Sequence, residues 1–155
     1  ALFSMLLQDG ALYRHNLHLQ EKFDRIAASE MRWETQTQDN DDMVIVAYGT
    51  AARIAESAIE ELKDEDLHVG LFRPITLWPY PMAALRELAA KVSKVAVFEL
   101  CLGQMVEDVI LSVGDRAEIY FHGLPGGKIP TPTDVADFIR SAARGDGNIG
   151  RRIAV

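Results

Sequence analysis

Four short, almost continuously apolar segments recur along the chain, and their even spacing limits the possible folds more than any other feature. A run of apolar residues without polar alternation is typical of a strand that is covered on both faces. The segments start about 25 residues apart, which leaves room for the crossover helix that parallel pairing requires. The sequence therefore predicts a three-layer α/β/α sandwich with a mostly parallel sheet. The predicted strands cover residues 43–48, 67–72, 94–99 and 117–122.

Apolar residues at helical spacing follow each predicted strand, and two of these helices have recognisable start signals. After the first strand, Thr50 is predicted to be the N-cap residue. Before the last helix, Thr131 is predicted to be the N-cap, Pro132 suits the first helical position, and Asp134 lies near the positive end of the helix dipole. These signals strengthen the prediction of alternating strands and helices.

The segments that flank this pattern have a different character. Leu17, Phe23 and Ile26 lie at near-helical spacing in a mixed-charge stretch, which predicts a leading helix. Residues 31–37 alternate bulky and polar side chains and predict an edge strand. The polar run that begins at Gly145 predicts a flexible tail. We therefore expect a leading helical segment at residues 1–30, the α/β domain at 31–143 and a flexible tail at 144–155.

Composition excludes several classes of function. Sixteen basic side chains against twenty-three acidic ones give a net charge of −7, which argues against nucleic acid or an anionic membrane as the main partner. Cys101 is the only cysteine, so the chain can form neither an internal disulfide nor a cysteine-ligated iron–sulfur cluster, and a cytoplasmic location is expected. No apolar run approaches the roughly 20 residues that span a bilayer. The first residue is not Met, which leads us to expect a piece of a longer protein.

The candidate site follows from the predicted sheet, because ligands bind such sheets at the carboxyl ends of the strands, where the strand order reverses. Arg73 and Glu99 stand where apolar strands stop, and they are expected to be either an ion pair or ligand contacts in a crevice, or else caps that hold the loops. Gly103 and Gln104 begin a helix whose free N–H groups could meet an anion, although a helix start alone explains this pair. The candidate crevice and interface residues are Tyr48, Gly49, Thr50, Arg73, Trp78, Glu99, Gly103, Gln104 and His122.

No catalytic residue and no metal site is predicted. The four histidines lack the spacing of metal ligands, and no serine lies in a nucleophile elbow. Cys101 lies between a strand end and a helix start, where a thiol pKa can fall, but a buried and inert cysteine is the favoured interpretation. The triplet that begins at Gly145 looks like the opening of a thiamine diphosphate motif, yet a polar tail explains it better.

Several segments, taken together and in order, resemble one known family. They are similar to the C-terminal, transketolase-like domain of the α subunit of 2-oxoacid:ferredoxin oxidoreductases over about residues 13–142. The residues before the domain look like those of the branched-chain (2-oxoisovalerate) members. Asn is common in this family where Cys101 stands. The segments that carry the resemblance are residues 15–22, 46–53, 69–79, 99–108 and 126–132.

The resemblance implies a five-stranded sheet in which residues 31–37 form an antiparallel edge strand and the strand order reverses between the strands that end near Tyr48 and Glu99. It also implies a complex that uses thiamine diphosphate, Mg²⁺ and iron–sulfur clusters to decarboxylate a 2-oxoacid, reduce ferredoxin and release an acyl-CoA. No cofactor is expected on this domain alone. Its expected partners are the beta, gamma and delta subunits and a preceding domain. Trp78 is expected to anchor such an interface, although packing within the domain explains its loop about as well.

Two other classes of function stay open on the sequence. One is a stand-alone module that binds a nucleotide or metabolite in the crevice between Tyr48 and Glu99. The other is the C-terminal domain of a different thiamine diphosphate enzyme, of the E1 or transketolase type. The run from Gly70 to Pro79, with its Arg73-Pro74 and Trp78-Pro79 pairs, argues against the latter.

Overall fold

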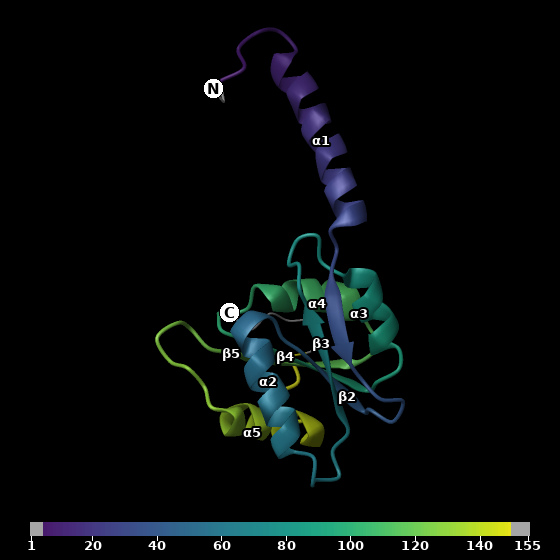
Figure 1. The fold of residues 1–155 in the computed structure, drawn as a ribbon, viewed down its shortest axis with the longest axis vertical. Coiled ribbons are helices and arrows are strands. Elements are labelled where there is room, and N and C mark those ends of the chain that lie inside the picture. Colours follow the sequence, from purple (N-terminus) through teal and green to yellow (C-terminus); the bar gives the residue numbers. More distant parts are fainter. Residues whose placement is uncertain (1–4, 150–155) are drawn as a thin grey trace.

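Strands and helices alternate in the computed structural model, which describes residues 5–149 (Figure 1). The sheet has five strands in the order β1-β3-β2-β4-β5. β2, β3, β4 and β5 are parallel, and β1 pairs antiparallel with β3 at the edge. The predicted fold class, the antiparallel edge strand and the reversal between β2 and β4 are all confirmed. The strands are β1 (Trp33–Gln36), β2 (Met43–Val46), β3 (Val69–Pro74), β4 (Lys94–Glu99) and β5 (Glu118–Gly123).

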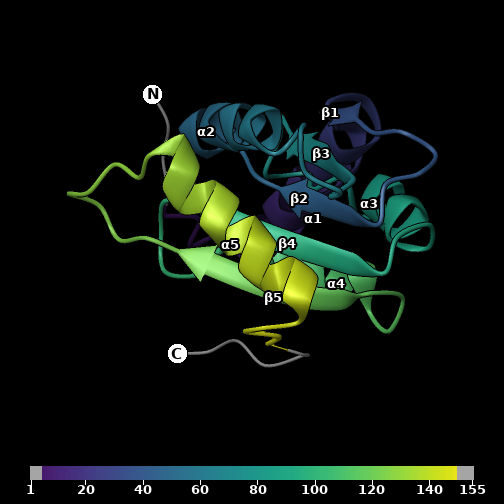
Figure 2. The same ribbon diagram turned by 90° about the horizontal axis from the view of Figure 1, so that it is seen from below.

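Helices cover both faces of the sheet, because successive strand residues point to opposite sides and both sides are apolar (Figure 2). Ile45 and Phe98 point to the α2 and α5 side, where alanines of α2 and Ile139 of α5 complete one core. Val46 and Val97 point to the α3 and α4 side and form the second core. The helices are α1 (Ala11–Ser29), α2 (Gly49–Glu61), α3 (Met82–Ala89), α4 (Met105–Val113) and α5 (Pro132–Arg144).

The two predicted helix starts have different outcomes. α5 begins as expected: the Thr131 hydroxyl accepts a hydrogen bond from the backbone N–H of Asp134 (3.2 Å), and the Asp134 carboxylate accepts one from the N–H of Thr131 (2.8 Å). The prediction for Thr50 is wrong. Tyr48 holds the N-cap position of α2, no side chain caps the helix, and Thr50 lies inside the first turn. Gly49 has φ 55°, a left-handed conformation that favours glycine, and α2 begins at this residue, one position before Thr50.

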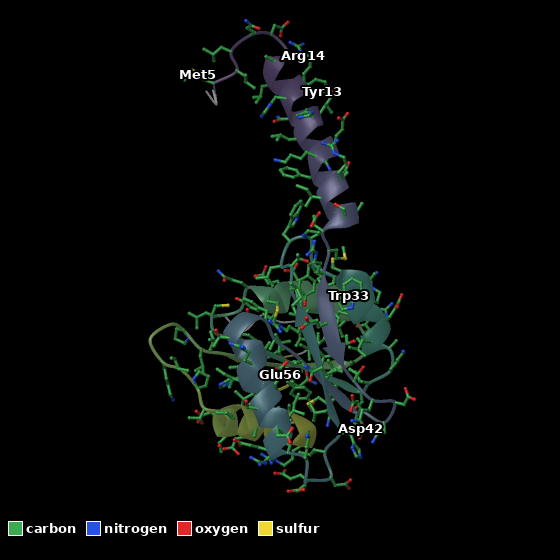
Figure 3. The ribbon with its side chains drawn as sticks, in the orientation of Figure 1. Met5, Tyr13, Arg14, Trp33, Asp42 and Glu56 are labelled. Atoms are coloured by element: carbon green, nitrogen blue, oxygen red, sulfur yellow. The ribbon has the colours of Figure 1, made fainter. Side chains whose placement is uncertain are left out.

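α1 extends away from the rest of the molecule (Figure 1). None of its 19 residues is buried. Its side chains, such as those of Tyr13 and Arg14, reach into solvent (Figure 3). Near its end the Phe23 ring packs edge-to-face on Trp78, with 5.5 Å between the ring centroids. The leading segment is thus helical, but it adds nothing to the two cores.

The residues after α5 turn back onto the sheet. α5 ends at Gly145 in a left-handed conformation (φ 89°). The backbone N–H of Ile149 then donates to the carbonyl of Ile119 (2.9 Å), and Asn148 forms an isolated bridge with Tyr120. This part of the expected tail therefore lies along β5, while residues 150–155 of that tail lie outside the described residues. Within residues 5–149, no helix combines the length and apolar character needed to cross a membrane.

Candidate functional site

The four parallel strands all end at one edge of the sheet, and we place the candidate site there. We call this the carboxyl edge. Between β2 and β4 the chain leaves the sheet in opposite directions, so the loops that follow these strands diverge and can leave a crevice. Tyr48 and Gly49 follow β2 on one side, and residues 100–104 follow β4 on the other.

Glu99, the last residue of β4, has a fully buried carboxylate with three hydrogen bonds. The backbone N–H of Met105 donates to Oε2 (2.9 Å), the N–H of Val106 donates to Oε1 (3.2 Å), and the thiol of Cys101 donates to Oε2 (2.9 Å). Gln104, in the N-cap position of α4, gives no side-chain cap. A carboxylate at this place satisfies two unpaired N–H groups and lies at the positive end of the helix dipole. The side chain of Glu99, at the end of β4, therefore caps the start of α4.

This arrangement decides between alternatives that the sequence left open. The N–H groups after Gly103 and Gln104 do not await an external anion, because Glu99 already accepts from the two that begin α4. Arg73 and Glu99 do not form an ion pair either. Arg73 lies opposite Glu34 in the β1–β3 ladder, and its Nη1 lies 3.2 Å from the Glu34 carboxylate. Glu99 has the capping role that the sequence favoured.

Cys101 and Tyr48 face each other across the ends of β4 and β2. The Cys101 sulfur lies 4.0 Å from the Tyr48 hydroxyl and 2.9 Å from Glu99, and Cys101 is half-buried rather than fully buried as expected. Burial raises the pKa of the Tyr48 phenol, and Cys101 and Glu99 raise it further. Tyr48 is therefore a neutral phenol near pH 7. These three side chains form a hydrogen-bonded group without a base or nucleophile pair that fits a known catalytic arrangement.

Trp78 and His122 lie apart from that group. Trp78 is 59% exposed, in the loop after β3. His122, on β5, is stacked between Phe98 (6.0 Å between centroids) and Phe138 of α5 (5.2 Å). Burial is the main cause of the lowered pKa of His122, and Asp134 opposes it. His122 therefore packs as a neutral aromatic ring under α5.

Sequence reasoning missed the buried polar groups beside α4. The Tyr80 hydroxyl is buried and has no hydrogen-bond partner among the described residues, and burial raises its pKa, with further contributions from Asp108 and Glu99. Burial also raises the pKa of Asp108, next to Glu107 in the first turn. The sequence contains one signal for the Glu99 cap. No Ser, Thr, Asp or Asn directly precedes α4, so its first N–H groups lack a local side-chain acceptor.

The carboxyl edge does not fit a metal ion, an iron–sulfur cluster or a diphosphate. Within residues 5–149, no three His, Cys, Asp or Glu side chains lie together as metal ligands. A single cysteine cannot hold a cluster. The start of α4, which would otherwise suit a phosphate group, already has the Glu99 carboxylate. We therefore assign no cofactor chemistry to these residues.

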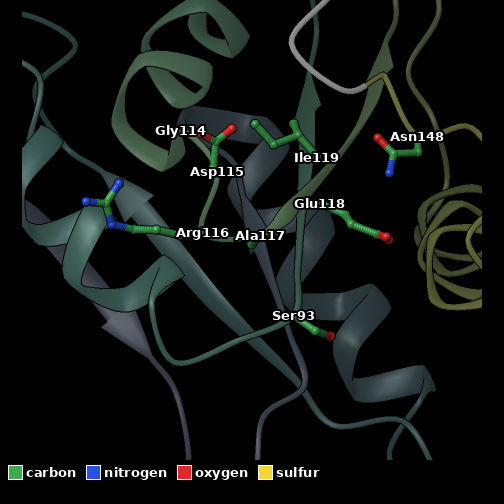
Figure 4. Close-up of a pocket in the computed structure, with 8 residues that line it drawn as sticks. All are labelled: Ser93, Gly114, Asp115, Arg116, Ala117, Glu118, Ile119 and Asn148. Atoms are coloured by element: carbon green, nitrogen blue, oxygen red, sulfur yellow. The ribbon is translucent and has the colours of Figure 1, made fainter.

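A hollow of about 480 Å³ lies at the opposite edge, where β4 and β5 begin (Figure 4). Ser93, Glu118 and Ile119 line one part of it, and Asn148 reaches it from the segment after α5. This hollow forms where residues 148–149 pair with β5, far from the strand ends at which such sheets bind ligands.

Two solved structures share this fold. A 2-oxoglutarate:ferredoxin oxidoreductase from Magnetococcus marinus, solved with 2-oxoglutarate, coenzyme A and succinyl-CoA bound, superposes with a TM-score of 0.69 at 23% identity, over 82% of this chain and 23% of that one. A split-gene transketolase, solved as an inactive tetramer of beta chains, gives a TM-score of 0.62 at 19% identity, over 73% of this chain and 41% of that one. The fold is thus that of a transketolase-like α/β domain.

Sequence relatives narrow this class to one family. The family model of the pyruvate:ferredoxin oxidoreductase core domain II matches residues 41–135, and the chain belongs to that family. Ketoisovalerate oxidoreductase subunit VorB from Methanothermobacter thermautotrophicus is 39% identical over 140 residues, which make up 90% of this chain and 40% of that subunit. 2-Oxoglutarate synthase subunit KorA from Methanocaldococcus jannaschii is 32% identical over 105 residues, 68% of this chain and 28% of that subunit. The chain thus spans well under half the length of these relatives.

Proposed function

We propose that this chain is the docking and scaffold domain of a 2-oxoacid:ferredoxin oxidoreductase subunit. The complex would oxidatively decarboxylate a 2-oxoacid to an acyl-CoA in the cytoplasm and pass the electrons to ferredoxin. Family membership supports the reaction class. The proposed substrate is 2-oxoisovalerate, because two ketoisovalerate oxidoreductase subunits are 39% and 34% identical over 90% of this chain. Two 2-oxoglutarate synthase subunits match only 75% and 68% of it, at 28% and 32% identity, and a pyruvate synthase subunit matches 43% of it at 35%.

The cofactors of this reaction belong, in this proposal, to other parts of the complex. Thiamine diphosphate with Mg²⁺ would be bound by a preceding domain and a beta subunit, and the iron–sulfur clusters by another chain of the complex. The observation that carries the proposal is the Glu99 cap, because it satisfies the free N–H groups at the start of α4, one of the two helix starts beside the crevice. What the carboxyl edge then offers to a partner is a set of exposed side chains on well-held loops.

These loops are suited to docking. Leu102 is 72% exposed and Trp78 is 59% exposed, and both follow strands that end at the carboxyl edge. Glu99 ties the loop that carries Leu102 to α4, so the loop is fixed before a partner arrives. A fixed loop can hold a cofactor-binding neighbour in register, and a small misplacement of such a neighbour costs a large factor in rate.

Replacing Trp78 tests the docking role. Trp78→Ala should weaken retention of the chain in the purified oxidoreductase about tenfold or more, because exposed aromatic anchors dominate interface energies. Leu111→Ala is the matched control, since Leu111 is 66% exposed on α4 away from the carboxyl edge, and it should retain wild-type assembly. Circular dichroism should show that both variants are folded. An unfolded Trp78→Ala chain, or equal retention of both variants, would refute the docking role.

Calorimetric titration separates this role from that of a stand-alone binding module. Nucleotides, coenzyme A and thiamine diphosphate should give no heat of binding with the isolated chain at micromolar concentrations. A saturable micromolar response to any of them would favour the module and would count against the scaffold.

A further inference from the structure

α1 leaves an apolar face without a partner. It buries no residue, although helices in proteins owe most of their stability to tertiary packing of an amphipathic face. Leu12, Leu19, Phe23 and Ile26 are separated by seven, four and three positions, so they line one side of the helix. Leu12 is 54% exposed and Phe23 is 42% exposed. We call these four residues the α1 stripe.

The α1 stripe is continuous with the carboxyl edge. α1 leads into β1, and the antiparallel register places Trp33, the first residue of β1, beside Pro74 at the end of β3. α1 therefore rises from the same edge at which the parallel strands end, directly beyond Trp33 (Figure 3). The stripe turns its Phe23 onto Trp78 of the loop after β3, and Ile75 and Leu77 of that loop are also exposed. One body that docks on the edge at Trp78 would also meet the stripe.

Basic side chains run beside the stripe. His18, Lys22 and Arg25 follow one another at spacings of four and three along one side of α1, which places them together. Among residues 5–149, neither Lys22 nor Arg25 has a carboxylate partner within ion-pair distance. The chain as a whole is acidic, with a net charge of −7. A partner surface that matches this helix is therefore an apolar groove with carboxylates on one border.

We infer that the α1 stripe and the carboxyl edge together clasp one folded partner, the part of the oxidoreductase subunit that this chain does not cover. This inference rests on the proposed function, and it adds the surface of this chain on which the partner docks. The matched stretch is 40% of the length of a VorB subunit, so most of such a subunit is available as this partner. A helix that crosses from one part of a subunit to the other would fix their distance as well as their orientation.

Photo-crosslinking in the assembled oxidoreductase tests this contact. Leu12 is replaced by the photoreactive residue p-benzoylphenylalanine, and Leu17 is replaced in the matched control. Leu17 lies on the same helix and is 49% exposed, but it points about 140° away from Leu12. The crosslinked peptides are then identified by mass spectrometry. Position 12 should react with oxidoreductase residues outside residues 1–155, with at least fivefold the yield of position 17. Crosslinks to a second copy of this chain or to lipid, or equal yields from both positions, would overturn the inference.

A second pair of variants tests the energetic contribution of the stripe. Both leucines are exposed in the chain alone, so neither substitution should unfold it. Leu12→Asp should weaken retention in the complex at least tenfold because Leu12 belongs to the α1 stripe, whereas Leu17→Asp should change it less than threefold. Equal losses would overturn the inference. The wild-type chain separates failure of the proposed function from failure of the α1 contact. If it is not recovered with oxidoreductase subunits at all, the proposed function fails. If it is recovered while both pairs behave alike, only the role of α1 fails.

Discussion

Glu99 limits what the start of α4 can bind. A buried carboxylate without partners would cost several kcal/mol, and here three donors and a helix dipole offset that cost. The same donors would otherwise attract a phosphate or a substrate carboxylate. The domain thus contains its own anion at the place where related architectures bind one, and this single residue favours docking over ligand binding.

Glu99→Gln should therefore lower the free energy of unfolding by about 2 kcal/mol. The amide has only one acceptor oxygen, so it cannot satisfy the N–H groups of Met105 and Val106 and the Cys101 thiol together. Urea denaturation followed by circular dichroism measures the change. Glu107→Gln, an exposed site in the first turn of the same helix, is the control and should cost less than about 0.5 kcal/mol. Similar losses in both variants would contradict the capping role.

The sequence predicted residue roles where the partner is local, and it failed where the partner is distant. Thr131 and Asp134 are three residues apart, so their mutual cap follows from the sequence. Arg73 pairs with Glu34, 39 residues earlier in the chain, and only the register of β1 against β3 fixes that pair. Glu99 lies between these cases, because it bonds N–H groups six and seven residues ahead through a loop whose course the sequence does not specify.

At the scale of elements, burial explains which strands the sequence revealed. β2 and β4 are covered on both faces, and they appear in the sequence as unbroken apolar runs. β1 is exposed along its whole length, so its prediction depended on weak alternation and on the family resemblance. The start of α2 was misplaced because a left-handed glycine, rather than a hydroxyl cap, begins that helix.

The two helix starts predict different effects of the same substitution. Thr131→Ala removes the hydroxyl that accepts from Asp134 and should destabilise the domain by about 1 kcal/mol. Thr50→Ala should change stability by less than about 0.5 kcal/mol, because Thr50 lies exposed inside the first turn of α2 and caps nothing. Chemical denaturation of both variants checks this. A loss at Thr50 as large as that at Thr131 would mean that the Thr50 hydroxyl caps α2 after all.

At the scale of the whole molecule, the two ends of the chain make opposite contributions. The segment after α5 covers the outer edge of β5 and brings Ile149 against the α3 and α4 side of the core. α1, which is much longer, buries nothing and meets the domain through Phe23 and Trp78. The short segment therefore stabilises the fold, and the long helix is available for a partner.

Truncation at each end tests this division. Removing residues 1–22, which keeps Phe23 on Trp78, should lower the free energy of unfolding by less than about 0.5 kcal/mol, because no buried surface is lost. Removing residues 145–155 should cost about 2 kcal/mol, because the deletion removes the Ile149 side chain that packs on the core and its hydrogen bond to Ile119. Urea denaturation of both truncated chains gives the two values. If the deletion of residues 1–22 proves the more damaging, α1 belongs to the folded core, and its stripe is not a free surface for a partner.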